Sequence, residues 1–191
     1  MSMTITKKYA RLRVVLMAGI VALMATPAVS AERQSPPETV PFVDLDRYAG
    51  RWYEIASIPN RFQRHCRGNT VASYRPVEGQ RIEVINSCLD KDGSVDTAQG
   101  IARIVDSSSN AKLEVSFVSL FGWHLFWGDY WVLELADDYS YVIVGTPNYR
   151  YGWILSRTPE LSTEIRQYLD ERLRASGYDP ADFVDTPQGL E

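Results

Sequence analysis

Short stretches in which apolar and polar residues alternate dominate the chain between residues 50 and 157. In the stretch 112–118, for example, Leu113, Val115 and Phe117 share one face. Alternation with a period of two is typical of a half-buried β-strand. Eight such stretches are separated by turn residues: 50–58, 69–74, 81–88, 96–105, 112–118, 130–135, 141–146 and 151–157. Regularly spaced strands without intervening helices favour an antiparallel sandwich or barrel.

A helical period follows the strands. Apolar side chains recur at every fourth position: Leu161, Ile165, Leu169 and Leu173. One apolar stripe predicts an amphipathic helix that packs on the outside of the strands by a single face. Thr158 or Ser162 can cap its start, and Gly177 can adopt the left-handed conformation after its end. Residues 183–184 predict a short terminal strand.

The N-terminal residues have the pattern of an export signal. A basic stretch from Lys7 to Arg13 precedes an uncharged run at 14–25, and small residues at 29–31 offer a cleavage site. The run is too short to cross a bilayer as a helix, which requires roughly 20 residues; an uncleaved anchor is the alternative. We expect a cleaved signal peptide at 1–31, a flexible, proline-containing linker at 32–41, and one folded domain at 42–191.

The net charge of the chain limits the classes of molecule that it can bind. The chain has 20 basic and 24 acidic residues, and four of the basic residues but none of the acidic ones precede Glu32. The mature protein would therefore carry a net charge of −8. A surface of that sign repels nucleic-acid phosphates and anionic membranes at long range. Nucleic-acid binding is excluded on this ground.

The chain contains two cysteines, Cys66 and Cys88. In an oxidising compartment an isolated pair is most simply a disulfide. The alternative is a reactive thiol at Cys66, activated by its neighbour His65. Neither cysteine lies near the predicted cleavage site, so we expect a soluble periplasmic protein without a lipid anchor.

Three motifs bear a family resemblance. Residues 45–56 (LDRYAGRWYEIA) resemble the first conserved block of the lipocalins, whose core is Gly-x-Trp. Residues 136–144 resemble the second block, and residues 153–157 (WILSR) the third, whose key residue is arginine. The blocks occur in the family order and cover nearly the whole mature chain. The sequence is most similar to the bacterial lipocalins, of the outer-membrane type, and to apolipoprotein D.

The resemblance implies an eight-stranded antiparallel up-and-down β-barrel with the C-terminal helix packed outside. It implies structural roles at the closed end for Gly50, Trp52, Asp138, Tyr139 and Arg157, with the guanidinium across the indole face. Combined with strand alternation, it predicts ligand-binding positions at Ala56, Tyr74, Asn86, Phe117, Trp127 and Trp131. A Cys66–Cys88 bridge would join two loops at the mouth of this barrel.

The loop at 119–127 is unusually apolar for a connection between strands. Exposed patches of this kind often mark binding sites. Three interpretations stay open: part of the binding mouth, a lid that buries itself over the barrel, or a dimer contact.

These features predict a periplasmic carrier of a hydrophobic or amphiphilic small molecule, with fatty acids and lysophospholipids as the first candidates in maintenance of cell-envelope lipids. We expect no catalytic residue, metal or cofactor, and a monomer or weak homodimer; transient membrane contact is compatible with the pattern. One alternative is a lipocalin-type enzyme, an isomerase or de-epoxidase, for which His65 and His124 are the histidines available. Another is a haem or pigment carrier with His124 as axial ligand.

Overall fold

A computed structural model describes residues 35–121 and 123–191. The predicted signal peptide at 1–31 lies outside the described residues. The elements are, in chain order, α1 (Leu45–Tyr48), β1 (Gly50–Ser57), β2 (Cys66–Val77), β3 (Arg81–Asp90), β4 (Val95–Ile104), β5 (Lys112–Ser116), β6 (Val118–Leu120), β7 (Trp123–Leu125), β8 (Gly128–Leu135), β9 (Tyr141–Gly145), β10 (Gly152–Ser156), α2 (Thr163–Ala175), the 3₁₀ helix η1 (Pro180–Asp182) and β11 (Val184–Asp185).

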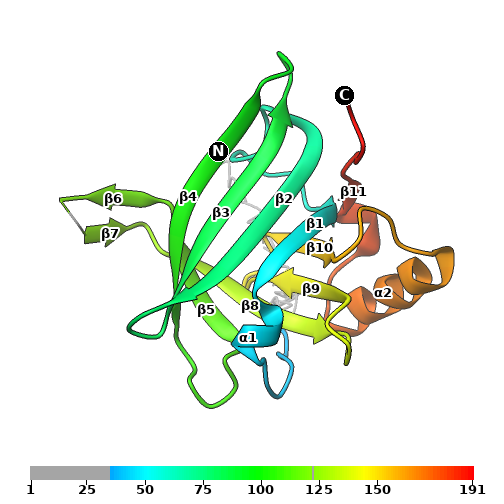
Figure 1. Cartoon of the computed structure of the whole chain (residues 1–191). Helices are drawn as coiled ribbons and strands as arrows, with labels where there is room; N and C mark the ends of the chain where they lie inside the picture. The colour runs from blue at the N-terminus through cyan, green and yellow to red at the C-terminus, as the bar shows by residue number, and fades with distance from the viewer. Residues whose placement is uncertain (1–34, 122) are drawn as a thin grey trace, which may run out of the picture. The chain divides into compact units, whose positions relative to one another are not determined.

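Eight strands close into a barrel, because β10 pairs with β9 on one side and with β1 on the other. All the pairings are antiparallel, and successive barrel strands are neighbours (Figure 1). The predicted barrel, its strand count and its outer helix are confirmed. The strands β6 and β7, which begin at the last residue of the predicted strand 112–118 and continue into the predicted loop 119–127, form a separate two-stranded hairpin.

The wall between β1 and β2 is completed by a third segment. These two strands pair only from Gly50 to Tyr53 on β1, and they separate above that point. Beyond it, β11 pairs with β1, and the Thr186 amide donates to the Ile55 carbonyl. On the other side, the Asn69 amide of β2 donates to the Pro187 carbonyl at 2.8 Å. Residues 184–190 therefore lie between the two strands and bond to both.

Trp52 lies fully buried at the closed end of the barrel, next to α1. The guanidinium of Arg157 lies 3.9 Å from the centre of its ring and donates to the backbone carbonyls of Arg47, Tyr48, Arg51 and Tyr139. Gly50 has a φ of +94°, which favours glycine, and a Cβ there would lie 3.4 Å from Arg157. The Arg157 guanidinium thus donates hydrogen bonds to four backbone carbonyls and covers the indole face of Trp52.

The turn between β8 and β9 meets α1 at the same end. The hydroxyl of Tyr139 accepts from the Asp44 amide, and the Arg47 guanidinium lies 4.0 Å above the Tyr139 ring. Asp138 accepts from the Ser140 amide, and hydrogen bonding by the side chain and the backbone of Ser140 lowers the pKa of its carboxyl. The residues that the family resemblance assigns to the closed end are therefore side by side in the structure.

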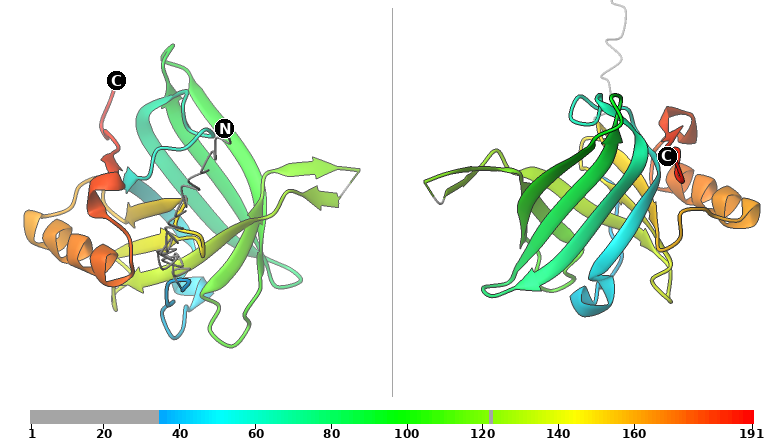
Figure 2. Two further views of the ribbon diagram at one scale, coloured as in Figure 1. Left: turned by 180° about the vertical axis from the view of Figure 1, so that it is seen from behind. Right: turned by 45° about the horizontal axis from the view of Figure 1, so that its top comes forward.

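Helix α2 covers the outside of the barrel (Figures 1 and 2). Ser162 caps its start by accepting from the Ile165 amide. Leu169 and Leu173 are buried against outward-facing residues of the barrel strands, including Leu133, Ile143 and Ile154. The predicted stripe is therefore the buried face. In the part of the chain that the structure describes, helices are too short or too polar to cross a membrane.

Part of the predicted flexible linker packs on the barrel. The Val40 amide donates to the Val132 carbonyl at 2.9 Å, and Pro37 is buried. Further back, the Ser35 carbonyl accepts from the Tyr149 hydroxyl. The β5–β8 pairing ends at Trp131, and beyond it the Val132 amide donates to the Ala111 carbonyl while the Val132 carbonyl accepts from Val40. Residues 35–41 thus belong to the folded body.

Candidate functional site

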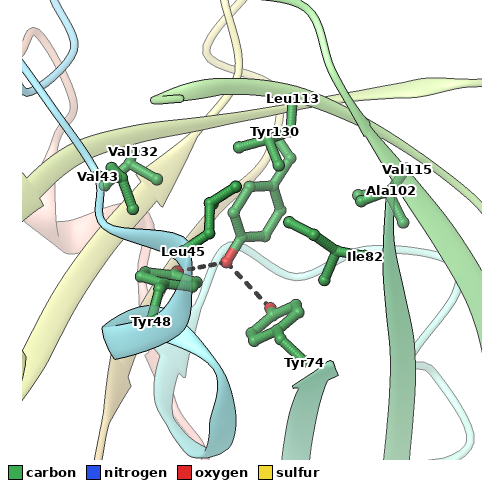
Figure 3. Close-up of a pocket in the computed structure, with 10 residues that line it drawn as sticks. All are labelled: Val43, Leu45, Tyr48, Tyr74, Ile82, Ala102, Leu113, Val115, Tyr130 and Val132. Atoms are coloured by element: carbon green, nitrogen blue, oxygen red, sulfur yellow. Dashed lines mark hydrogen bonds between the residues drawn. The ribbon is translucent and has the colours of Figure 1, made fainter. Parts of the chain in front are cut away.

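A cavity lies inside the barrel near its closed end. The free volume there is about 10 Å³, room for about one water molecule, so the surrounding side chains nearly fill the space. Its lining comes from α1, the segment before it, and inward-facing positions of β2, β3, β4, β5 and β8: Val43, Leu45, Tyr48, Tyr74, Ile82, Ala102, Leu113, Val115, Tyr130 and Val132 (Figure 3). Aliphatic side chains and aromatic rings form this wall, so it favours hydrocarbon.

Three tyrosines meet at the floor of the cavity. The Tyr130 hydroxyl lies 2.7 Å from that of Tyr48 and 3.0 Å from that of Tyr74, so the three oxygens turn toward one another (Figure 3). Burial raises the pKa of Tyr74 to about 12 and holds the pKa values of Tyr48 and Tyr130 well above the ordinary range. All three phenols are therefore protonated at neutral pH, and the cavity presents ring carbon to a ligand.

Asn86 and Phe117 lie above the cavity toward the mouth. Asn86 follows Ile82 and Val84 on the inner face of β3, and its Oδ1 is buried without a hydrogen-bond partner among the described residues. The Phe117 ring lies over Gly100 of β4, where a Cβ would come within 2.7 Å of it. Phe117 is 44% exposed. By strand parity both side chains lie on the inner face of the barrel.

A buried carboxylate occupies the β1 side of the upper barrel. Glu54 is 5% exposed and accepts from the hydroxyls of Ser57 and Thr186. It also accepts from the Gln63 amide at 2.7 Å, and Gln63 in turn accepts from the Trp153 indole. None of these partners is a cation. The interior of the upper barrel therefore carries one negative charge that is held by neutral donors.

The aromatic residues of two loops meet at the rim. Phe62, in the β1–β2 loop, lies 5.9 Å from Tyr151, in the β9–β10 loop. Tyr151 stacks on Trp153 at 6.2 Å. A continuous aromatic surface thus leads from the exposed rim to the Trp153–Gln63–Glu54 network inside.

Three of the six predicted ligand-binding residues face outward. Ala56 is buried under α2, because a bulge between Glu54 and Ala56 reverses the alternation of β1. Trp131 packs with the outer cluster under the Lys112 ammonium, and Trp127 lies 4.2 Å from the Arg103 guanidinium. The expected inward orientation of these three residues is wrong. Tyr74, Asn86 and Phe117 face the interior.

Three residues that face the interior were not predicted from the sequence: two on the other face of β8 and one on β10. Tyr130 and Val132 line the cavity in place of the neighbouring tryptophan, and Trp153 faces the mouth. The pairing with β5 could have indicated which face of β8 is inside, because residues paired across two strands point to the same face of the sheet. Leu113, on the apolar face of the segment 112–118, lies opposite Tyr130, and Lys112 lies opposite Trp131.

The hairpin β6–β7 projects from the barrel (Figures 1 and 2). Phe121 is 94% exposed, Trp123 76% and Phe126 83%. The interpretation of this segment as a self-buried lid is therefore wrong. His124 lies on the same hairpin and not among the cavity residues, so the structure gives no support to an axial haem ligand there.

Cys66 and Cys88 form a disulfide, with their Cα atoms 5.7 Å apart. The predicted bridge is confirmed, and the alternative of a reactive thiol is wrong. His65 pairs with Asp96 at 2.9 Å beside it. Among the described residues, these two cysteines and His65 form the one cluster of side chains that could bind a metal ion. The disulfide leaves neither cysteine as a free thiol to act as a ligand.

Comparison with known proteins decides the family. The model of the lipocalin-like domain matches residues 43–188. The chain is a lipocalin. Temperature-induced lipocalin-1 of Arabidopsis thaliana is 38% identical over 154 residues, covering 79% of this chain and 82% of that protein. Outer membrane lipoprotein Blc of Escherichia coli K12 is 35% identical over 160 residues, covering 82% and 87%.

Apolipoprotein D of Mus musculus is 36% identical over 163 residues, covering 81% of each chain. Among solved structures, insecticyanin of Manduca sexta has a TM-score of 0.63 at 24% identity, covering 81% of this chain and 84% of that one. Lobster apocrustacyanin A1 has a TM-score of 0.60 at 19% identity, covering 84% and 94%. These two share the fold. Membership of a family of binding and transport proteins supports a hydrophobic small-molecule ligand for this lipocalin.

Proposed function

We propose that this lipocalin carries a single-chain amphiphile, a fatty acid or a lysophospholipid, in the periplasm, and that it serves the maintenance of envelope lipids. The observation that carries the proposal is the closed barrel with a small, carbon-lined cavity at its floor, which an acyl chain would enlarge by moving the side chains that nearly fill it. Each methylene that leaves water contributes about 0.8 kcal/mol, which favours a long chain.

The periplasmic location rests on the export-type N-terminus at 1–31 and on the disulfide, which needs an oxidising compartment. Relatives in Escherichia coli are named outer membrane lipoproteins. In this lipocalin no cysteine precedes Cys66, so we propose a protein without a lipid anchor that moves between membranes.

Native mass spectrometry of the protein purified from its own periplasm tests carriage, with a lipid adduct expected. Titration with a fluorescent fatty acid then tests the cavity. Ala102→Phe places a ring in the cavity and should weaken binding by an order of magnitude or more, whereas Val95→Phe, at an exposed position of the same strand, should not. Equal affinity in both variants, with melting curves showing that both fold, would overturn the cavity as the site.

The hairpin β6–β7 supports a further part of the proposal, transient contact with a lipid surface. Its large exposed side chains are aromatic or aliphatic, and residues 117–128 contain no carboxylate. Aromatic side chains favour the interface between headgroups and acyl chains. Because the net charge of the mature chain repels anionic membranes at long range, we expect the contact to favour zwitterionic bilayers.

Co-sedimentation with phosphatidylethanolamine–phosphatidylcholine vesicles tests this contact. Replacing Phe121, Trp123 and Phe126 by serine should abolish it, and Val95→Ser, which removes an exposed apolar residue elsewhere, should not. Unchanged sedimentation of the triple variant would refute membrane contact. A shift from dimer to monomer in analytical ultracentrifugation, without any vesicle effect, would assign the hairpin to self-association instead.

A further inference from the structure

Two arginines flank the aromatic surface at the rim. The Arg61 guanidinium lies 5.1 Å from the centre of the Phe62 ring, and that of Arg150 lies 6.0 Å from the centre of the Tyr151 ring. Because Phe62 and Tyr151 are themselves in contact, the two cations border one surface although they are far apart in the sequence. Both arginines are exposed.

These two cations are not neutralised by the protein. Four other arginines form ion pairs with carboxylates: Arg75, Arg103, Arg166 and Arg172. Arg61 and Arg150 form no ion pair with any residue that the structure describes, and their side chains make no hydrogen bond there. A guanidinium offers five donors in a planar fork that suits carboxylate and phosphate oxygens. The rim therefore has free donors for an anion.

The interior of the barrel, unlike the rim, disfavours an anion. The cavity lining contains only aliphatic residues and tyrosines, and the charged side chain that faces the upper barrel is the carboxylate of Glu54. Its negative charge adds to the burial that raises the pKa of Tyr74. An anionic headgroup inside would lose its hydration, find no cation in this lining and meet a like charge. An acyl chain, by contrast, would contact the carbon atoms of the aliphatic and aromatic side chains that line the cavity.

We propose that Arg61 and Arg150, on the aromatic surface of Phe62 and Tyr151, form a subsite for the anionic headgroup of a single-chain lipid that enters the barrel tail first. The inference rests on the proposed carrier function and adds orientation and headgroup class to it. Carboxylate and phosphate headgroups without a compensating cation fit this subsite, and neutral or zwitterionic headgroups on the same chain bind more weakly.

Isothermal titration calorimetry below the critical micelle concentration tests the subsite with lysophosphatidate, lysophosphatidylcholine and monoacylglycerol of the same acyl chain. Wild type should bind lysophosphatidate about fivefold more tightly than monoacylglycerol, which is the scale expected for exposed charge pairs. Raising the salt concentration should reduce this preference. In Arg61→Gln/Arg150→Gln the preference should disappear while monoacylglycerol affinity is kept.

The matched control is Arg64→Gln/Arg174→Gln, which removes the same charge from an exposed position of the β1–β2 loop and from α2. It should retain the preference. Equal affinities for the three lipids in wild type, or the same loss in both double variants, would overturn the subsite and leave the carrier function standing. Binding of inorganic phosphate as tight as that of lysophosphatidate would also overturn it, because the site would then be independent of the barrel. Absence of binding by all three lipids would overturn the carrier function itself.

Discussion

The tyrosine cluster at the cavity floor allows a test of which contacts stabilise the barrel. Three phenol protons are available for the two hydrogen bonds among Tyr48, Tyr74 and Tyr130, so one donor has no acceptor within the cluster. Tyr130→Phe removes the central hydroxyl and leaves the other two without their partner in an apolar cavity. A buried hydrogen bond contributes about 1 kcal/mol, so the loss of two should lower the free energy of unfolding by about 2 kcal/mol.

The triple variant with phenylalanine at all three positions should be more stable than the single variant. It removes every polar group of the cluster together, and no buried hydroxyl is left without a partner. We expect it to lie within about 1 kcal/mol of wild type. Tyr53→Phe is the control, because no hydrogen bond of its hydroxyl joins it to another described residue, and it should change stability by less than about 0.5 kcal/mol.

Urea denaturation followed by far-ultraviolet circular dichroism, with the disulfide intact, gives the four values. The order expected is Tyr130→Phe least stable, with the triple variant above it and the Tyr53 control near wild type. A Tyr130→Phe variant within 0.5 kcal/mol of wild type, a difference of about the size of ordinary surface effects, would refute the reasoning. So would a triple variant that is less stable than the single one, since the losses would then add residue by residue.

Three other predictions follow from the structure. The raised pKa of Tyr74 means that the folded state holds its proton more tightly than the unfolded state, so stability should be full below pH 10 and fall between pH 10 and about 12; the triple phenylalanine variant should lose less in alkaline urea titrations. Trp52→Ala should cost about 3–5 kcal/mol, because it empties a fully buried site beneath Arg157, and a melting temperature equal to that of wild type would contradict this. Trp131→Ala should leave fatty-acid affinity unchanged, because the ring packs on the outside, and a tenfold loss in fluorescence titration would place it in the site after all.

The sequence predicts the strands because alternation reports burial directly, strand by strand, whereas the closure of these strands into a barrel is predicted only by the family resemblance. It predicts the outer helix for the same reason, since the Leu169 and Leu173 stripe has one buried face. It fails for Trp131 because alternation on one strand does not say which face is inside. It fails for Ala56 because a bulge between Glu54 and Ala56 reverses the parity of β1, and this bulge has no signal in the sequence.

The site depends on residues that are far apart along the chain. Tyr48 and Tyr130 are separated by 82 positions, and Glu54 and Thr186 by 132. No local pattern joins such pairs; only the closed register of the strands does. The apolar segment 119–127 is conspicuous in the sequence, but its composition does not distinguish a lid from the projecting hairpin that the structure contains.

Closure of the wall between β1 and β2 depends on residues that are synthesised more than a hundred positions later. The Asn69 side chain binds both the amide and the carbonyl of Leu190, across 121 residues, and β1 pairs with β10. Contacts of such long range form slowly, because the intervening chain must first be ordered. A nascent chain therefore cannot complete its cylinder before residues 184–190 emerge from the ribosome.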